Sequence, residues 1–188
     1  MATLRQDAAN PVHGLSEAAK IKGPPPVHLW NPPFCGDIDM RIAADGTWYY
    51  LNSPIGRKPL VKLFSSVLRK DVDGKHYLVT PVERCGIVVD DAPLVAVRME
   101  SKGGDISFET LTDDIVTVDA EHPLRFAREA GTNGLKPYVL VRGRLEALVA
   151  RPIFYDLVAL GAVEGEWFGV RSGGLFWPMQ RAAEIGLG

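Results

Sequence analysis

The chain has 188 residues and a formal net charge of -2 at pH 7, with 46% hydrophobic and 23% charged residues. This composition is typical of a globular protein, and the near-neutral charge argues against a general nucleic-acid binder held by phosphate neutralisation. No segment approaches the ~20 consecutive apolar residues that span a bilayer, and the start lacks the apolar stretch of a secretory signal. We therefore expect a cytoplasmic protein without a membrane span, in which any anion site is local.

Residues typical of metal and catalytic sites are sparse. Cys35 and Cys85 lack the paired spacing of a zinc site, and the four histidines are scattered without HxH or HxxxH spacing. We interpret both cysteines as buried thiols, with a redox role for the pair as the alternative. The chain has no GxSxG, GxGxxG or Walker motif. We therefore predict no metal and no cofactor, and we lean against an enzyme.

The N-terminal region combines a short helix, expected over residues 14–21, with five prolines between positions 24 and 33. Such a proline-rich stretch favours an extended path without ladder hydrogen bonds. We interpret it as a strap that lays Trp30 and Phe34 onto the domain. The alternative is a docking arm for a protein partner.

A β-hairpin is predicted next, with strands over residues 37–42 and 48–50 joined at Asp45-Gly46. A two-residue loop would place Arg41 opposite Tyr50, and Asp39 opposite Asn52. One face would then be apolar, with Ile38, Met40, Ile42, Tyr49 and Leu51. The other face would combine charge with aromatic surface, through Asp37, Asp39, Arg41, Trp48 and Tyr50.

Two cations, Arg57 and Lys58, precede Pro59, where a helix is expected to begin. The N-terminal end of a helix is electropositive and prefers anions, so two cations there are unfavourable without a negative group. That group is either an acidic side chain of this chain, with Asp37 and Asp39 as candidates, or a bound ligand.

The rest of the chain is predicted as mostly strands. A second Asp-Gly hairpin is expected at residues 73–74. The further elements are strands over 82–91, 94–100, 105–111 and 114–120, a helical turn over 121–130, a long strand over 136–150 with a bend at Gly143, a helix over 151–161 and an apolar hairpin over 166–179.

The two longer helices begin alike, because Lys58-Pro59-Leu60-Val61 matches Arg151-Pro152-Ile153-Phe154. We interpret this match as a repeat. The expected fold class is α+β, with two related halves, each a mainly antiparallel sheet around one helix. The predicted organisation is a helix and strap over residues 1–36, a first half over 37–91 and a second half over 92–188.

Several motifs together resemble one bacterial family, catalogued as domain of unknown function 1285. They are "CGDIDMRIAADGTWYYLNSPIGRKPLVKLFSSVL", "YLVTPVE", "EHPLRF" and "RPIFYDLVALG". The resemblance implies a duplicated core and a second half similar to pleckstrin-homology domains. It also implies a ligand pocket at the interface of the halves, a nucleotide-like ligand and a role in signal transduction.

The candidate ligand-binding residues fall into two groups. In the first half, cations and helix amides would bind phosphate, a carboxylate would bind ribose hydroxyls, and an aromatic ring would stack on a base. In the second half, Arg142, Arg144 and Glu146 would share one strand face, with His122 nearby. The full set is Arg57, Lys58, Asp39, Arg41 and Tyr50 from the first half, with His122 and Arg144 from the second.

These residues predict a ligand-binding or sensory protein for a small anionic ligand, and the family resemblance implies a nucleotide-based one. One alternative is a protein-interaction module, in which the proline arm and the second half contact a partner. Another is an enzyme acting on a phosphorylated metabolite, with Asp37 or Asp39 as base.

Overall fold

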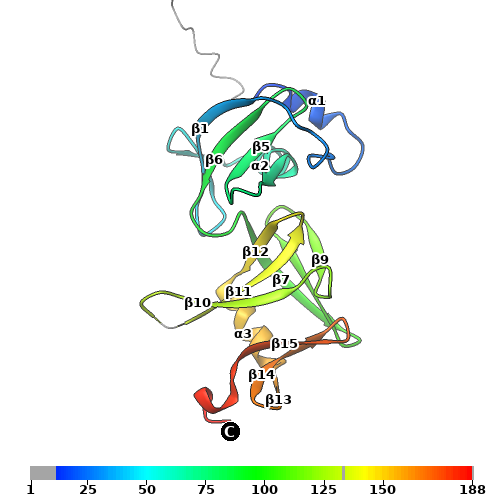
Figure 1. The fold of residues 1–188 in the computed structure, drawn as a ribbon, viewed down its shortest axis with the longest axis vertical. Helices are drawn as coiled ribbons and strands as arrows, with labels where there is room; N and C mark the ends of the chain where they lie inside the picture. Colours follow the sequence, from blue (N-terminus) through cyan, green and yellow to red (C-terminus); the bar gives the residue numbers. More distant parts are fainter. Residues whose placement is uncertain (1–11, 133, 188) are drawn as a thin grey trace, which may run out of the picture. The chain divides into compact units, whose positions relative to one another are not determined.

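The structure, a computed structural model, describes residues 12–132 and 134–187. The chain divides into an N-terminal unit, residues 1–43 and 47–90, and a C-terminal unit, residues 44–46 and 91–188. Each unit contains a six-stranded, mostly antiparallel sheet, and helices are few (Figure 1). The predicted α+β class is confirmed.

The sheet of the N-terminal unit has the strand order β3-β2-β1-β6-β5-β4. Strands β1 and β6 run parallel, and the other neighbours are antiparallel. The elements of this unit are α1 (Leu15–Ala19), β1 (Phe34–Ile42), β2 (Trp48–Tyr50), β3 (Ser53–Pro54), α2 (Lys58–Ser66), β4 (Leu68–Lys70), β5 (His76–Val79) and β6 (Arg84–Val89).

The large sheet of the C-terminal unit has the order β10-β11-β12-β7-β8-β9, with β7 and β12 parallel, and a third sheet has the order β13-β14-β15. The elements are β7 (Leu94–Lys102), β8 (Asp105–Thr110), β9 (Ile115–Thr117), β10 (Leu124–Arg128), β11 (Leu135–Arg142), β12 (Leu145–Val149), α3 (Arg151–Ala159), β13 (Ala162–Glu164), β14 (Trp167–Ser172), β15 (Leu175–Arg181) and the 3-10 helix η1 (Ala182–Ile185).

The two large sheets share one topology. When the six strands of each unit are numbered from its first, both sheets read 3-2-1-6-5-4, with the first and sixth strands parallel. The two halves are therefore related, as the sequence predicted. The prediction that the two helices are equivalent elements of a repeat is wrong. Helix α2 connects the third strand to the fourth, whereas α3 follows the sixth strand. Both helices begin with a proline because proline suits the first helical turn.

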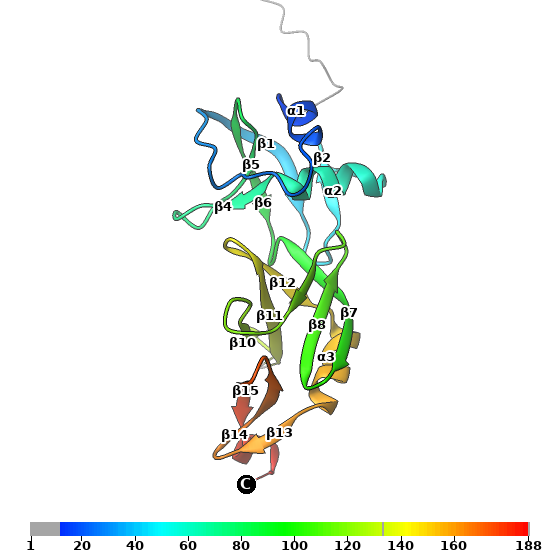
Figure 2. The same ribbon diagram turned by 90° about the vertical axis from the view of Figure 1, so that its right-hand side faces the viewer.

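Helix α2 covers the inner face of its sheet. Phe64 is buried, and its ring stacks on Trp48 with centroids 6.1 Å apart and planes at 15°. Trp48 is paired with Ile42 and therefore points to the same side of the sheet. Figure 2 shows α2 beside β2. This packing makes one side of the N-terminal sheet the core of its unit.

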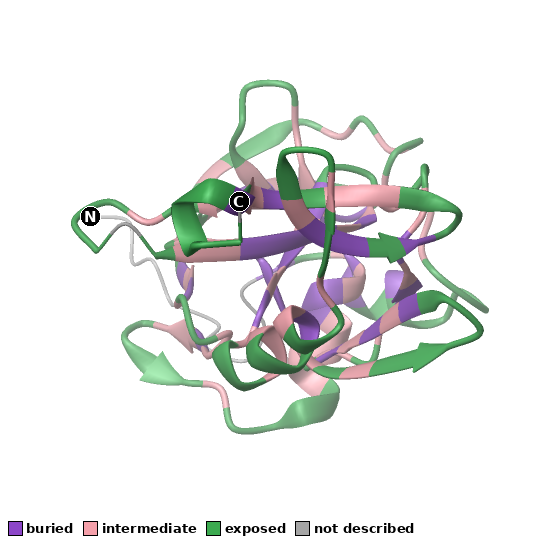
Figure 3. Cartoon of the chain, turned by 90° about the horizontal axis from the view of Figure 1, so that it is seen from below, coloured by how far each residue is buried: buried purple, intermediate pink, exposed green. Residues whose placement is uncertain are grey.

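The C-terminal unit has no helix between its third and fourth strands, and its third sheet lies near both edges of the large one. Strand β15 lies beside β10, and β14 lies beside β8. The buried hydroxyl of Ser172 accepts a hydrogen bond from the Ile106 amide at 2.8 Å and donates one to the Val118 carbonyl at 2.7 Å. Buried residues concentrate along the strands, with exposed residues on the loops (Figure 3).

The predicted register of the first hairpin is wrong by one residue. The Ala43 amide donates to the Thr47 carbonyl, so the loop has three residues, and its last one, Gly46, has a left-handed φ of 85°. A three-residue loop with glycine in this conformation is a common alternative to the two-residue turn. As a result, Tyr49 rather than Tyr50 lies opposite Arg41.

Two further predictions in the C-terminal half are wrong. The expected helical turn over 121–130 contains strand β10, which pairs with β11 along its whole length. The expected long strand over 136–150 is the hairpin of β11 and β12, because Gly143, with φ of 55°, makes a tight turn instead of a bend.

Candidate functional site

The outer face of the N-terminal sheet carries a group that we call the polar sheet face: Asp37, Asp39, Arg41 and Tyr49. Arg41 lies next to the inward-facing Ile42 and Met40, so it points to the side away from α2. Its guanidinium lies 4.7 Å from the Tyr49 ring centroid and donates to Asp90 at 2.5 Å. The Arg41 charge is therefore already paired, and Asp39 is exposed beside it on β1.

Tyr50 is separated from this face. It is paired with Met40, so its half-buried ring lies on the core side of the sheet, and the structure does not bring it together with Asp39 and Arg41. Sequence reasoning missed Tyr49 as the aromatic partner of Arg41. The Asp45-Gly46 pair could have indicated the correct register, because it fits a three-residue loop as well as a two-residue one.

The start of α2 also lies away from the polar sheet face, because α2 packs on the inner side of the sheet. Arg57 is the N-cap residue, with φ of -85° and ψ of 98°, and both Arg57 and Lys58 are exposed. The first turn has no acidic residue, and no side chain in the described part of the protein caps the helix. Within residues 12–132 and 134–187, no carboxylate forms an ion pair with Arg57, so neither Asp37 nor Asp39 is its internal partner.

An arginine cluster fixes the proline-rich strap. The guanidinium of Arg69 donates to the carbonyls of Val27 at 2.8 Å and Trp30 at 2.7 Å, and it also contacts both carboxylate oxygens of Asp71. These bonds hold the middle of the strap against β4 and compensate carbonyls that have no ladder partner.

Arg84 extends this cluster. Its guanidinium donates to Asp71 at 2.9 Å and lies over the ring of Tyr77, 4.8 Å from the centroid. The Tyr77 ring meets Phe34 edge-to-face with centroids 6.0 Å apart, and the Tyr77 hydroxyl donates to Asp73 at 2.6 Å. The ring contacts and the ion pair of Arg84 form within the chain, which supports a structural role for this cluster, although the buried Arg84 Nε has no hydrogen-bond partner among the described residues.

His76 is the strongly perturbed histidine of the N-terminal unit. Its Nε2 atom is buried and has no hydrogen-bond partner among residues 12–132 and 134–187. Burial, together with the nearby Lys70 charge, lowers the pKa of His76 to about 4. The ring is therefore neutral at physiological pH.

In the C-terminal unit, the predicted site residues do not gather. His122 Nδ1 lies 3.0 Å from the Leu140 carbonyl, which fixes its ring to β11. Arg144 is exposed in the turn between β11 and β12. Arg142 binds Asp114 at 3.1 Å, and Glu146 binds Arg125. The prediction that Arg142, Arg144 and Glu146 share one strand face is wrong. The hairpin turn between β11 and β12 separates Arg142 from Glu146.

A second ion-pair network lies where the C-terminal unit begins. Asp91 accepts hydrogen bonds from Lys136 at 2.9 Å and from the Tyr138 hydroxyl at 2.7 Å. Burial and the hydrogen bond to Asp91 raise the pKa of Tyr138 to about 12. Arg125 lies 4.2 Å from the Tyr138 ring centroid and contacts Glu146 through two nitrogens. Each charge in this network has a partner within the unit.

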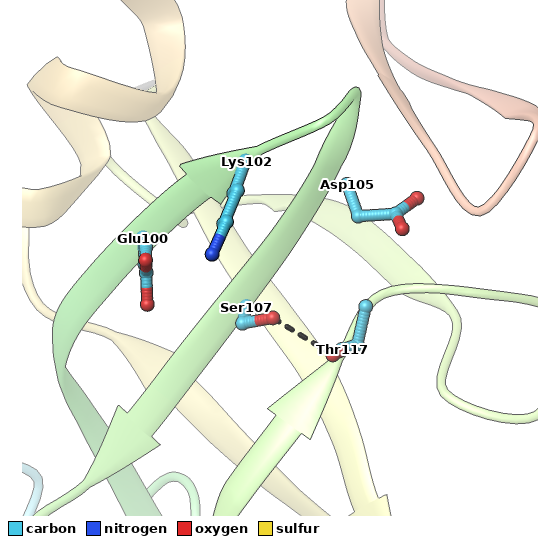
Figure 4. A pocket seen from close by; sticks show the side chains of 5 residues that line it. All are labelled: Glu100, Lys102, Asp105, Ser107 and Thr117. Atoms are coloured by element: carbon cyan, nitrogen blue, oxygen red, sulfur yellow. Dashed lines mark hydrogen bonds between the residues drawn. The ribbon is translucent and has the colours of Figure 1, made fainter.

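A shallow polar hollow of about 220 Å³ lies on one face of β7, β8 and β9 (Figure 4). The hydroxyls of Ser107 and Thr117 are hydrogen-bonded to each other at 2.7 Å. The lining also has charges of both signs, and its residues are Glu100, Lys102, Asp105, Ser107 and Thr117. With one cation and two carboxylates, this hollow does not favour a phosphate.

Within the part of the chain that the structure describes, no group of three or more His, Cys, Asp and Glu side chains is placed to hold a metal. In the same residues, no helix is both long and apolar enough to cross a membrane.

Two family models match successive parts of the chain. Residues 25–92 match "Domain of unknown function (DUF1285), N-terminal domain", and residues 93–179 match "Protein of unknown function (DUF1285), C-terminal domain". No curated protein matches.

Two solved structures are similar to the chain. The crystal structure of a DUF1285 family protein from Silicibacter pomeroyi DSS-3 is 49% identical, covers 91% of this chain and 96% of that one, and has a TM-score of 0.84. A DUF1285 family protein from Shewanella baltica OS155 is 26% identical, covers 65% of this chain and 91% of that one, and has a TM-score of 0.54.

Proposed function

Since the chain belongs to the DUF1285 family, as its motifs predicted, and that family is described as of unknown function, we propose from its own residues that it binds a small anionic ligand. The binding residues are Arg57 and Lys58 at the start of α2. One observation carries the proposal: the exposed guanidinium of Arg57 has no carboxylate partner within the described residues.

The electrostatics of the α2 start support this assignment. Two adjacent cations stand at the positive end of a nine-residue helix whose first turn has no acidic side chain. Elsewhere in the N-terminal unit, the comparable cations Arg41, Arg69 and Arg84 are each paired with an aspartate. An arriving phosphate or carboxylate would supply the charge that the chain itself does not provide at Arg57.

A nucleotide is the specific form of ligand that the family resemblance suggests, and a sensory role in signal transduction would follow from reversible binding. The polar sheet face does not contribute to this site, because the sheet separates it from the α2 start. The aromatic and carboxylate groups expected to contact base and ribose therefore do not join Arg57, and the proposal rests on recognition of the anionic group.

The experiment is isothermal titration of the full chain with pyrophosphate and with nucleoside diphosphates. We expect binding that an Arg57→Ala/Lys58→Ala double variant weakens at least tenfold. The matched control is Lys22→Ala/Lys75→Ala, which removes the same charge from two exposed positions of the same unit and should leave binding unchanged. Equal binding by both double variants, or no binding by wild type, would refute the proposal.

A further inference from the structure

The two cysteines of the chain lie on neighbouring strands. Phe34 of β1 and Arg84 of β6 are partners in the parallel pair, and the next residue on each strand is a cysteine, Cys35 and Cys85. Neighbouring strands are about 4.8 Å apart, which falls within the range of about 4.4 to 6.8 Å that disulfides require between Cα atoms.

Alternation along the two strands predicts that both thiols face the same side of the sheet. The Arg84 guanidinium lies 5.7 Å from the Phe34 ring centroid, so these two side chains share the outer face. The following residues alternate to the inner face, where Cys85 lies beside its buried partner Leu78. The register of β1 against β6 shifts between Phe34 and Asp37, a segment that contains both Cys35 and Gly36, and Gly36 has a left-handed φ of 100°.

The two thiols differ in access. Cys85 is buried, as expected from the sequence, whereas Cys35 is exposed, so the expectation of two buried thiols is wrong for Cys35. Its exposure arises because β1 begins at Phe34, so Cys35 lies at the end of the strand. One thiol is therefore open to a reagent in solution, and the other is shielded beside it.

We propose that Cys35 and Cys85 form a reversible disulfide when a hydroperoxide oxidises the protein, which makes this pair a redox modification site. In the first step, the sulfur of Cys35 attacks the peroxide oxygen, the O–O bond breaks, and Cys35 becomes a sulfenic acid while the hydroperoxide leaves as an alcohol or water. In the second step, the sulfur of Cys85 attacks the Cys35 sulfur, the S–O bond breaks, and water leaves with the Cys85 proton. Two thiols thus give two electrons to one hydroperoxide.

The order of the two steps follows from the environments of the thiols. Burial, with smaller contributions from Glu83 and Cys35, raises the pKa of Cys85 to about 12. Cys85 is therefore a poor first nucleophile toward a dissolved oxidant, and the exposed Cys35 reacts first. Cys85 is the resolving thiol: it attacks the sulfur of the Cys35 sulfenic acid, which the strand pairing places beside it.

The disulfide would fasten the point where the strap enters the sheet. The Arg84 amide already donates to the Pro33 carbonyl at 3.0 Å, directly before Cys35. A covalent bond between β1 and β6 at this end would hold the last strap residues against the sheet.

The test is to treat the full chain with hydrogen peroxide and then map its peptides by mass spectrometry without reduction. We expect one intramolecular peptide pair containing Cys35 and Cys85, lighter by two hydrogen atoms and restored by dithiothreitol. In a Cys85→Ala variant, Cys35 should stop at the sulfenic acid and be trapped by dimedone. In a Cys35→Ser variant, Cys85 should stay a thiol.

The measurement on wild-type protein is enough to refute the proposal, so the test does not depend on the folding of either variant. Oxidation of Cys35 to the sulfinic acid with Cys85 still a thiol would refute it. So would a Cys35–Cys35 bond between two chains, or the absence of any change at Cys35.

Discussion

Both carboxylate oxygens of Asp71 accept hydrogen bonds from the guanidinium of Arg69, at 2.5 and 3.1 Å. One of these oxygens also accepts from Arg84 at 2.9 Å, and the Asp71 side chain is 16% exposed. A single carboxylate therefore pairs with two arginines of the sheet and keeps Arg69 in place to hold the strap.

The first prediction is that Asp71→Asn lowers the free energy of unfolding by about 2 to 3 kcal/mol, because it leaves two partly buried guanidiniums without their counter-charge. Urea denaturation followed by far-UV circular dichroism measures the change. Glu17→Gln is the control, since it removes an ion pair with Lys20 in which both side chains are more than 60% exposed. That variant should change stability by less than about 1 kcal/mol, and an equal effect of the two variants would contradict the role of Asp71.

The second prediction concerns acid pH. The folded-state pKa of His76 is lowered from 6.5 to about 4, so the unfolded chain takes up a proton in this interval and the folded chain does not. Stability is therefore complete above pH 6.5 and is lost as the pH falls toward 4. We expect His76→Gln to lose less stability than wild type between pH 7 and pH 5 in thermal unfolding. Identical losses in the two proteins would show that His76 titrates normally.

The third prediction addresses the turn between β2 and β3. Leu51 and Asn52 both have left-handed φ values, 48° and 60°, and the Leu51 side chain is 60% exposed. Leucine is unfavourable in this conformation, whereas asparagine adopts it readily. Leu51→Asn should therefore raise the free energy of unfolding by about 0.5 to 1 kcal/mol. Val72→Asn, at an exposed position without a positive φ, should give no such gain, and stabilisation by both variants would point to lost surface hydrophobicity instead.

The fourth prediction tests the third sheet. A Cβ atom at Gly169 would overlap the Trp177 carbonyl on the neighbouring strand β15, and the backbone cannot move without breaking that pairing. Gly169→Ala should destabilise the protein by about 3 kcal/mol. Gly56→Ala is the matched change, because nothing lies within 4 Å of its added methyl group and its φ is not positive. Equal melting temperatures for the two variants would mean that β14 and β15 are not closely paired.

Most of the strands were predictable because alternation of apolar and polar residues depends only on the neighbouring positions of one strand, but β10 was predicted as a helical turn. Register was not predictable, because it depends on loop length, and Asp45-Gly46 ends a three-residue loop here. A single residue of shift exchanged Trp48 and Tyr49 between the two faces of the sheet, which is why the polar sheet face lacks Trp48 and Tyr50.

Only the part of the candidate site that lies within one short stretch of sequence could be predicted. The cations before Pro59 could be located by the helix signal. The sequence left open whether an aspartate pairs with Arg57, and in the described residues Arg57 has no carboxylate partner. The partners of Arg41 and Arg142 are Asp90 and Asp114, which are 49 and 28 residues away. Such distant pairings arise from the fold and leave no local pattern.

The two large sheets are covered by different elements, and this difference decides which fragments of the protein can be made. The helix that covers the N-terminal sheet lies between two strands of that sheet in the chain, because α2 connects the edge strand β3 to the edge strand β4. The C-terminal sheet is covered by α3, which lies beside β7, and by the third sheet, whose strand β15 lies beside the edge strand β10. Protein truncated at Gly161 would leave the edge of β10 uncovered and prone to self-association, so fragments of this unit should retain β13 to β15.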